Sequence, residues 1–201
     1  HVLTLPTHDT PTTATPNDDT IYSVFFADLQ NEPVIITIPA ITDRYYAVAL
    51  GDAFVENTDY IGTRMGDLKG GTYALVGPNW KGSIPKNIKA IKMRHQVFAF
   101  VARIQVRNPG EDLKKAVALQ TKITSQSLSK YLGKIKEDTY TPIEKYPNPD
   151  KALDWYAYLF KKLEVNRPIA RDTAFTKSLA NIGVKLDGKT DVNAMPDAVK
   201  R

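Results

Sequence analysis

The chain of 201 residues carries 27 Lys and Arg against 22 Asp and Glu, which gives a formal net charge of +5. A hydrophobic fraction of 42% and a charged fraction of 24% exclude an intrinsically disordered chain, and no apolar run is long enough to cross a bilayer. The absence of cysteine excludes disulfides, thiolate nucleophiles and zinc–thiolate sites.

The first residues contain no basic segment followed by an apolar one, so we expect any signal peptide to have been removed or to lie outside this sequence. A chain without cysteine that is rich in Thr, Asn, Pro and Tyr is compatible with an oxidising environment. We therefore expect an extracytoplasmic protein, either secreted or held in the cell envelope.

The excess of positive charge lies in the second half of the chain. Residues 1–110 carry 10 Lys and Arg against 10 Asp and Glu, whereas residues 111–201 carry 17 against 12. Basic pairs such as Lys114-Lys115 lie among acidic residues at helical spacings, which indicates a solvated helix face. Aromatic residues interleaved with a dense arginine patch are missing, so we expect no nucleic-acid partner.

In the first half, β-branched and aromatic residues gather in short runs that Pro, Gly, Asn and Asp separate, which is typical of strands. Five runs stand out, at residues 20–29, 33–39, 44–50, 72–76 and 88–107, with the last one broken near Arg94 and His95. In this last run the period of two predicts a core face and a wetter face. The core face would hold Phe98, Phe100, Ala102, Ile104 and Val106, and the wetter face Arg103, Gln105 and Arg107.

The links between these runs are short and contain turn residues such as Gly70-Gly71, and no helical pattern interrupts them before residue 108. Short links favour antiparallel hairpins over helical crossovers. Several short strands with a turn signal about every ten residues predict an antiparallel β-sandwich or barrel.

After residue 108 the apolar residues recur at three and four, which predicts a long amphipathic helix that reaches Leu132. Asn108 would cap this helix, and Pro109 would take its first position, where a missing N–H costs nothing. Asn148-Pro149-Asp150 predicts the start of a second helix that continues through Leu163.

A third helix is expected at residues 172–181, with Phe175 and Leu179 facing inward and Gly183 as a left-handed stop. The change of period near residue 108 divides the chain. We therefore predict an α+β protein with an antiparallel β-sandwich domain at residues 1–107 and a small helical domain at residues 108–201.

The densest group of polar side chains is Asn17-Asp18-Asp19-Thr20, which precedes an apolar strand that carries Tyr22. Its spacing differs from that of a calcium loop and lacks the closing Glu, so we expect no bound metal. Two interpretations remain open. The group is either a ligand site or a turn in which Asn17 and one Asp cap backbone amides.

Asp43-Arg44-Tyr45-Tyr46 places a permanent cation and two phenols at the start of a strand. Such a group can bind a carboxylate, a phosphate or a sugar face, although Arg44 can instead pair with Asp18 or Asp19. Alternation sends one of the two tyrosines inward and the other outward. Gly62-Thr63-Arg64 matches no nucleotide-binding glycine motif, and no cofactor is indicated.

An N-terminal His with a second His on a β-sandwich is the copper-binding arrangement of lytic polysaccharide monooxygenases. Here only His8 and His95 could join His1, and no other part of that pattern is present. No Gly-x-Ser-x-Gly elbow occurs either, and we assign no catalytic residue.

Several of these groups together resemble the family catalogued as domain of unknown function 1254. The chain is similar to its Pro-Asn-x-Asp-Thr-x-Tyr-Ser motif and to its Arg-Tyr-Tyr strand. The matching residues are Pro16, Asn17, Asp19, Thr20, Tyr22 and Ser23, then Arg44, Tyr45, Tyr46, Asp52 and Asn57, then Gly62-Thr63-Arg64, Tyr73, Gly77-Pro78, Trp80 and Gly82, and finally Arg103, Asp112-Leu113, Leu119-Gln120 and Asn181-Ile182-Gly183.

The resemblance implies an immunoglobulin-like β-sandwich followed by a small helical domain, and it implies no reaction. Members of this family occur widely in bacteria, are often exported, and usually continue into a jelly-roll domain numbered 1214. The sequence begins within what looks like the first family motif and stops near the point where that second domain usually begins.

Two functions from different classes remain open. The first is an exported module that binds a small molecule, a carbohydrate or a partner, or that assembles into a homo-oligomer or extracellular polymer. Residues 1–15, rich in Thr and Pro, suit strand addition. The ligand contacts of such a module are expected from Asn17, Asp18, Asp19, Tyr22, Arg44, Tyr46 and Arg64.

The second function is a hydrolase-like enzyme acting on a carbohydrate or an ester. Asp18 or Asp19 would act as acid or base, and Arg44 or Arg64 would stabilise negative charge. Geometry separates the two functions, because an enzyme requires Asp19 and Arg64 to meet in one cleft.

Overall fold

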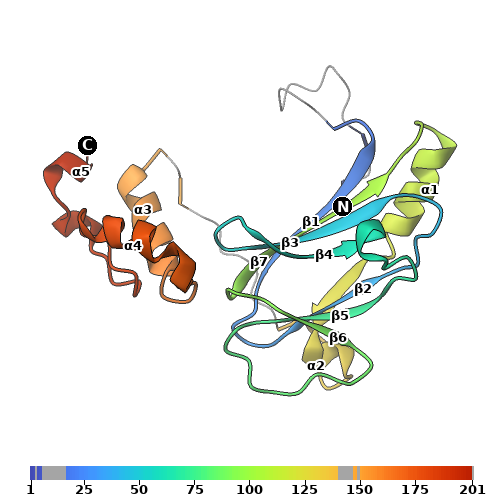
Figure 1. The fold of residues 1–201 in the computed structure, drawn as a ribbon, viewed down its shortest axis with the longest axis horizontal. Coiled ribbons are helices and arrows are strands. Elements are labelled where there is room, and N and C mark those ends of the chain that lie inside the picture. Colours follow the sequence, from blue (N-terminus) through green and yellow to red (C-terminus); the bar gives the residue numbers. More distant parts are fainter. Residues whose placement is uncertain (3, 6–16, 140–146, 149, 201) are drawn as a thin grey trace.

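The computed structural model describes residues 1–2, 4–5, 17–139, 147–148 and 150–200. Two four-stranded sheets form one body, and a group of short helices lies beside it (Figure 1). The protein is therefore of the mixed α+β class, as predicted.

The first sheet has the strand order β1-β7-β3-β4, with every pair of neighbours antiparallel. Its strands are β1 (Thr20–Asp28), β7 (Val97–Gln105), β3 (Tyr46–Asp52) and β4 (Asn57–Gly62). The expected runs at residues 20–29 and 44–50 and the end of the run at 88–107 correspond to β1, β3 and β7. Strand β4 is a finding of the structure, because residues 57–62 lack the dense β-branched composition that marks the other strands.

The second sheet has the order β6-β5-β2-β8, formed by β6 (Lys89–Lys92), β5 (Gly71–Val76), β2 (Val34–Ile38) and β8 (Thr124–Ser127). The expectation of antiparallel pairs throughout is wrong at one place, because β5 and β6 are parallel. The physical reason is the link at residues 77–88, which is long enough to return the chain to the same end of the sheet.

The main core lies between the two sheets and takes residues from both of them. Every second residue of β7 is buried, so the core face predicted from Phe98 to Val106 is confirmed. Val48 and Leu50 of β3 and Val34 of β2 are fully buried in the same cluster. Burial of these side chains supplies most of the free energy that holds the sheets together.

The long helix predicted after residue 108 is wrong, because α1 (Glu111–Gln120) ends early and the chain then forms β8. Residues 121–127 are mostly Thr, Ser and Ile, which favour helix weakly, and β2 offers them an open edge to pair with. Ala116 of α1 is buried in the main core. The sheet-bearing part of the chain therefore extends beyond the expected boundary at residue 107.

Helix α1 also begins later than predicted. Gly110, with φ of 102°, occupies the position before the first helical residue, so Asn108 and Pro109 lie outside the helix. This backbone conformation is readily accessible only to glycine. A short helix, α2 (Leu128–Tyr131), follows β8 and packs on the outer side of the second sheet.

The C-terminal part contains α3 (Ala152–Lys162), α4 (Thr173–Ala180) and α5 (Asp197–Lys200), joined through the 3₁₀ helices η2 (Ala170–Asp172) and η3 (Val192–Ala194). The second and third expected helices are thus confirmed, and Gly183 has the predicted left-handed φ of 86°. This part has a small core of its own around Val184, Val192 and Met195. The expectation for Phe175 is wrong, because its side chain is 65% exposed.

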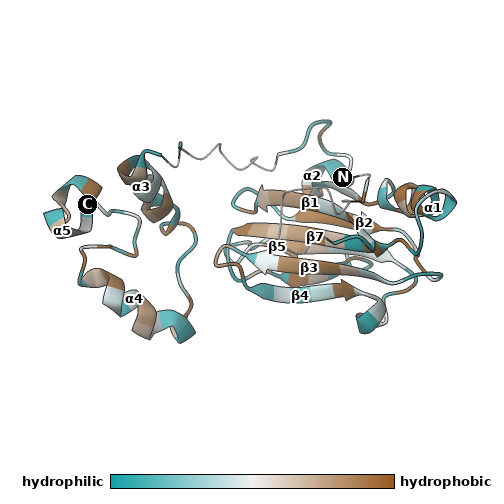
Figure 2. Ribbon diagram, turned by 90° about the horizontal axis from the view of Figure 1, so that it is seen from above, coloured by the Kyte–Doolittle hydropathy of each residue, from teal (hydrophilic) through white to brown (hydrophobic). Residues whose placement is uncertain are grey.

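The helical part touches the first sheet near the start of β7. Asn166 Oδ1 accepts a hydrogen bond of 2.9 Å from the Val97 N–H, and His95 Nε2 lies 3.0 Å from the Arg167 carbonyl oxygen. Figure 2 shows the helices α3, α4 and α5 set to one side of the strands. None of the helices in the described ranges is long and apolar enough to cross a membrane.

Candidate ligand-binding groove

The Asn17 side chain closes a turn immediately before β1. Asn17 Nδ2 donates to the Thr20 carbonyl oxygen at 2.7 Å, and Asn17 Oδ1 accepts from Thr20 Oγ1 at 3.0 Å. These bonds use the amide locally, as in the turn interpretation of this motif. Asp18 and Asp19 are exposed, and within the described ranges neither carboxylate contacts Arg44 or Arg64.

Arg44 is a buried structural residue whose side chain is 1% exposed. Its guanidinium lies 3.0 Å from Asp43 Oδ2 and 2.9 Å from Asp112 Oδ1, and it also donates to the Gln105 carbonyl oxygen. The hydrogen bonds that Arg44 donates to Asp43 and Asp112 raise the pKa of Arg44, and the one to Asp43 lowers the pKa of Asp43. The expected role of Arg44 in ligand contact is therefore wrong, because its donors are already used inside the fold.

Tyr46 is also buried, so the prediction that the two adjacent tyrosines face opposite sides is confirmed. Its hydroxyl donates to the Asp67 carbonyl oxygen, and burial together with the Asp67 charge raises its pKa to about 12. Tyr45 and Tyr22 instead lie on the outer side of the first sheet. The Arg103 guanidinium lies 4.9 Å from the centre of the Tyr22 ring, within cation–π range.

The outer face of the first sheet has a regular arrangement of side chains that follows from strand register. One row runs Tyr22, Arg103, Ala47 and Gly62 across the four strands, and the next runs Val24, Val101, Ala49 and Tyr60. Strand β3 thus carries only alanine in these rows, whereas larger side chains flank it on β7 and, at Tyr60, on β4. This difference in side-chain size hollows the face over β3.

The hollow is a groove of about 630 Å³ on β3, β4 and β7. Its floor is apolar and its rim carries phenol, amide and guanidinium groups. The groove is lined by Tyr45, Tyr46, Ala47, Ala49, Asn57, Tyr60, Ile61, Gly62, Arg64, Met65, Val101 and Arg103. Of the predicted site residues, only Arg64 and Tyr46 line it directly, while Tyr22 borders it through Arg103.

The Gly62-Thr63-Arg64 segment positions Arg64 at this rim. Gly62 has a φ of 138°, and a Cβ atom there would lie 2.5 Å from the Tyr46 carbonyl oxygen, so only glycine fits. Thr63 Oγ1 accepts from the Tyr46 N–H at 3.0 Å and ties the 3₁₀ helix η1 (Thr63–Met65) to β3. Arg64, the next residue, is exposed.

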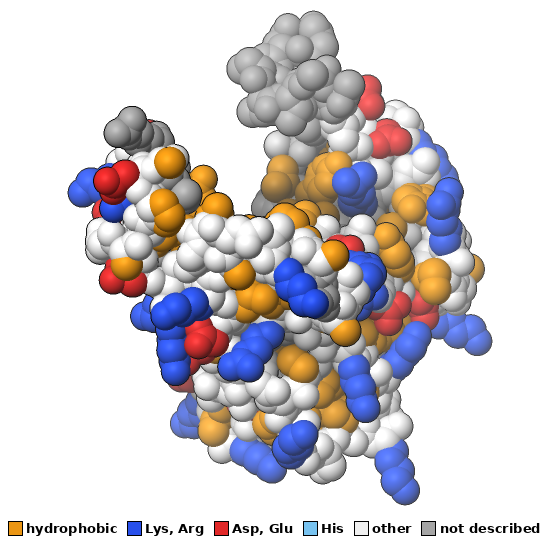
Figure 3. Space-filling view, turned by 60° about the vertical axis from the view of Figure 1, so that its left-hand side comes forward, with side chains coloured by type: hydrophobic (Ala, Val, Ile, Leu, Met, Phe, Trp, Pro, Cys, Tyr) orange, Lys and Arg blue, Asp and Glu red, His pale blue; other side chains and the backbone are white. Residues whose placement is uncertain are grey.

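The groove has a distinct electrostatic character, because none of its lining residues is acidic. Within the described part of the chain, Arg64 and Arg103 form no ion pair. In the view of Figure 3, Lys and Arg side chains are spread over the surface among apolar and acidic ones. The groove therefore offers two available guanidinium groups over an apolar floor.

Sequence reasoning missed four polar residues of the groove, namely Tyr45, Asn57, Tyr60 and Arg103. Tyr45 and Arg103 were visible as outward positions of predicted strands. Asn57 and Tyr60 lie on β4, which was not predicted, so no sequence pattern could place them beside the other two.

The copper-type arrangement is not formed by His1 and His95. His1 Nδ1 lies 2.7 Å from Ser23 Oγ, whereas His95 is buried with its Nδ1 atom 3.2 Å from Asp52 Oδ2. His8 lies outside the described residues. Among the residues that the structure does describe, no cluster of three or more His, Asp or Glu side chains could hold a metal ion.

A solved structure with a similar fold is that of the VPA0106 protein from Vibrio parahaemolyticus, with a TM-score of 0.76 and 25% sequence identity. The alignment covers 93% of the chain described here and 46% of the Vibrio chain, so this chain spans about half the length of that protein. No curated protein matches the sequence. Residues 1–127 match the family described as "Protein of unknown function (DUF1254)", and the chain belongs to that family.

Proposed function

We propose that this protein is a binding module that takes a negatively charged carbohydrate in the groove on the first sheet. The observation that carries the proposal is the pairing of Arg64 and Arg103 with a tyrosine-rimmed apolar floor that has no acidic side chain. Guanidinium groups bind carboxylates through paired hydrogen bonds, and tyrosine rings pack on the apolar faces of sugars. An acidic sugar chain offers both features together.

The same geometry disfavours the hydrolase alternative. Cleavage of a glycosidic bond usually requires two carboxyl groups on either side of that bond, roughly 5 to 9.5 Å apart. The groove holds no carboxyl group, and Arg44, which would stabilise charge, is enclosed by Asp43 and Asp112. Asp18 and Asp19 also lie outside the set of residues that line the groove.

The proposal also covers the type of β-sandwich, the export of the protein and its role in an assembly. The two sheets would form an immunoglobulin-like sandwich, supported by the shared core and by the strand orders of both sheets. The protein would be an exported bacterial or archaeal module, supported by its lack of cysteine. Such a module would act as a contact surface within an assembly or polymer.

Binding of hexagalacturonate, measured by calorimetry at low salt and compared with neutral maltohexaose, tests the proposal. We expect the acidic oligosaccharide to bind and the neutral one to bind at least tenfold more weakly. Each of Arg64→Gln and Arg103→Gln should weaken binding about tenfold, since a hydrogen bond to a charged group contributes about 1.5 kcal/mol or more.

Lys115→Gln is the matched control, because Lys115 is an exposed cation on α1, outside the groove. It should leave the dissociation constant unchanged although it removes the same charge. Absence of hexagalacturonate binding, or equal weakening by Lys115→Gln and the two arginine variants, would contradict the proposal. Tighter binding of a single-stranded oligonucleotide than of the sugar would also contradict it.

A further inference from the structure

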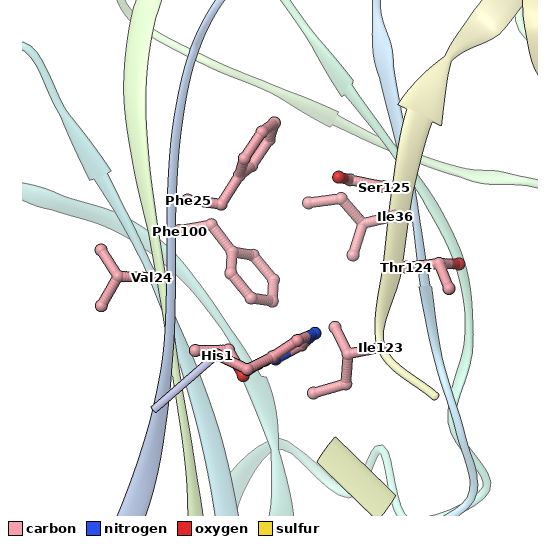
Figure 4. A pocket seen from close by; sticks show the side chains of 9 residues that line it. His1, Val24, Phe25, Ile36, Phe100, Ile123, Thr124 and Ser125 are labelled. Carbon is pink, nitrogen blue, oxygen red and sulfur yellow. The ribbon is translucent and has the colours of Figure 1, made fainter. Parts of the chain in front are cut away.

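The chain has three histidines, and the structure describes the surroundings of two of them. His1 lies in a pocket between the two sheets, where its Nδ1 atom lies 2.7 Å from Ser23 Oγ (Figure 4). A hydroxyl group can donate or accept, so a neutral His1 ring satisfies this contact. His95 differs, because its side chain is 2% exposed and both of its ring nitrogens face oxygen atoms that accept hydrogen bonds.

The two contacts of the His95 ring together define its protonation. Nε2 lies 3.0 Å from the Arg167 carbonyl oxygen, and Nδ1 lies 3.2 Å from Asp52 Oδ2. Among the described residues Nδ1 has no aligned hydrogen-bond partner, so its contact with Asp52 is a close ion pair. A neutral imidazole has one N–H and one bare nitrogen, so either neutral form would set a nitrogen lone pair against an oxygen atom. Only the imidazolium, with a proton on each nitrogen, satisfies both contacts.

Asp52 is held in place by the turn that it closes between β3 and β4. Its Oδ1 atom accepts from the backbone N–H groups of Phe54 at 2.9 Å and of Glu56 at 3.1 Å. Val55 in the same turn has a φ of 61°, which β-branched residues rarely adopt, so the turn depends on these bonds. The Asp52 side chain is only 2% exposed, and a carboxylate so deeply buried requires a counter-charge. The His95 imidazolium supplies it.

This ion pair lies at the junction between the first sheet and the helical part. Three polar contacts join the two parts here, namely His95 with Arg167, Val97 with Asn166, and Glu56 with Arg171. The Phe54 ring lies against the imidazole, with ring centres 4.8 Å apart, and helps to keep water from it. Loss of one proton from His95 would set a lone pair against an oxygen atom and leave the Asp52 charge buried without its partner.

We propose that the doubly protonated form of His95 holds the helical part on the first sheet, so that this contact weakens as the pH rises. The docked form binds a proton that a free imidazole releases near pH 6.5, so docking is strongest below about pH 6.5 and is lost as the pH rises above it. The other charged groups at the junction are Asp52, Glu56, Arg94, Arg167, Arg171 and Asp172. Carboxyl and guanidinium groups ordinarily titrate below about pH 5 or above about pH 12, so a change near neutral pH comes from His95.

Long-range proton–nitrogen NMR of the unmodified protein shows which ring nitrogens carry a proton. At about pH 7.5, where most free histidine is neutral, we expect a proton on both nitrogens of His95. Contacts with the Phe54 ring protons assign the signal. In concentrated urea, where the junction is lost, the same ring should be neutral at this pH. A His95 ring that is neutral in the folded protein would overturn the proposal.

Hydrogen exchange at the Val97 amide reports docking, because this amide donates to Asn166 across the junction. Its protection factor, corrected for the intrinsic pH dependence of exchange, should fall at least tenfold between about pH 5.5 and 8.5, since loss of one bound proton changes an equilibrium up to tenfold per pH unit. Amides of β2 and β5 in the second sheet are the internal control and should stay constant.

His95→Gln removes the titrating group, so its Val97 protection factor should not depend on pH. A constant protection factor in the unmodified protein, an equal fall in His95→Gln, or an equal fall at the control amides would overturn the proposal. If His95→Gln does not fold, the ring protonation and the exchange of Val97 in the unmodified protein still decide between the two outcomes.

Discussion

Arg44 Nη2 lies 2.9 Å from Asp112 Oδ1, and this ion pair joins the start of β3 to the first turn of α1. The second oxygen of Asp112 accepts from the Arg107 N–H at 2.7 Å. One carboxylate thus fixes both the end of β7 and the arginine that precedes β3. Arg44, which the sequence suggests as a ligand contact, links the first sheet to α1 in the structure.

Asp112→Asn should lower the melting temperature by several degrees at neutral pH. The backbone hydrogen bond from Arg107 and the hydrogen bond from Arg44 lower the pKa of Asp112, so the carboxylate stabilises the fold above its ordinary pKa. This stabilisation is lost as the pH falls below about 4 and through the folded-state pKa. Melting curves of both proteins between pH 2 and 7 should therefore converge at the acid end, and a constant difference would contradict this role.

Gly62→Ala should destabilise the protein by about 1 to 3 kcal/mol, the usual cost of a strained backbone position. The added Cβ atom would lie 2.5 Å from the Tyr46 carbonyl oxygen at a φ of 138°. Gly51→Ala is the matched control, since its Cβ atom would meet Ala99 Cβ at an ordinary 3.6 Å. Urea denaturation measures both variants, and equal losses of unfolding free energy would show that the turn does not require glycine.

Ala49→Leu should fill the floor of the groove without changing its charge. Ala49 lies between Val101 and Tyr60 in the outward row of the sheet, so a larger side chain there occupies the space for ligand. Hexagalacturonate binding should weaken at least tenfold while the melting temperature stays within a few degrees. Ala118→Leu, on an exposed position of α1, should leave binding unchanged. A variant at Ala49 that binds normally would place the ligand elsewhere.

Asn166→Ala should weaken the junction between the helical part and the first sheet. Asn166 is 4% exposed, and its loss removes the 2.9 Å bond that the part-buried Val97 N–H now makes. An unpaired amide that is fully buried costs about 1 to 3 kcal/mol, and a part-buried one costs less. Hydrogen exchange at Val97 should accelerate, and urea denaturation should report the loss. Asn193→Ala, on an exposed residue, is the control and should leave both quantities unchanged.

Local pattern was sufficient for part of the fold. The alternation in β7 identified Phe98, Phe100 and Ile104 as core residues because a strand turns successive side chains to opposite faces. Gly183, which follows α4, has the left-handed φ predicted for a residue that ends a helix. Residues 121–127 could not be assigned in the same way, because Ile123 is their only apolar residue and shows no period by itself. Only the pairing of residues 124–127 with the open edge of β2 makes them a strand.

For the candidate site too, sequence determined one part and tertiary structure another. By itself the sequence determined which side chains are available, including Arg44, Arg64 and the outward position of Arg103. Tertiary structure alone decided that Arg44 is enclosed by two carboxylates while Arg64 and Arg103 border one groove. The physical reason is that burial and pairing of a charge depend on strands distant in sequence, which pattern along one segment cannot specify.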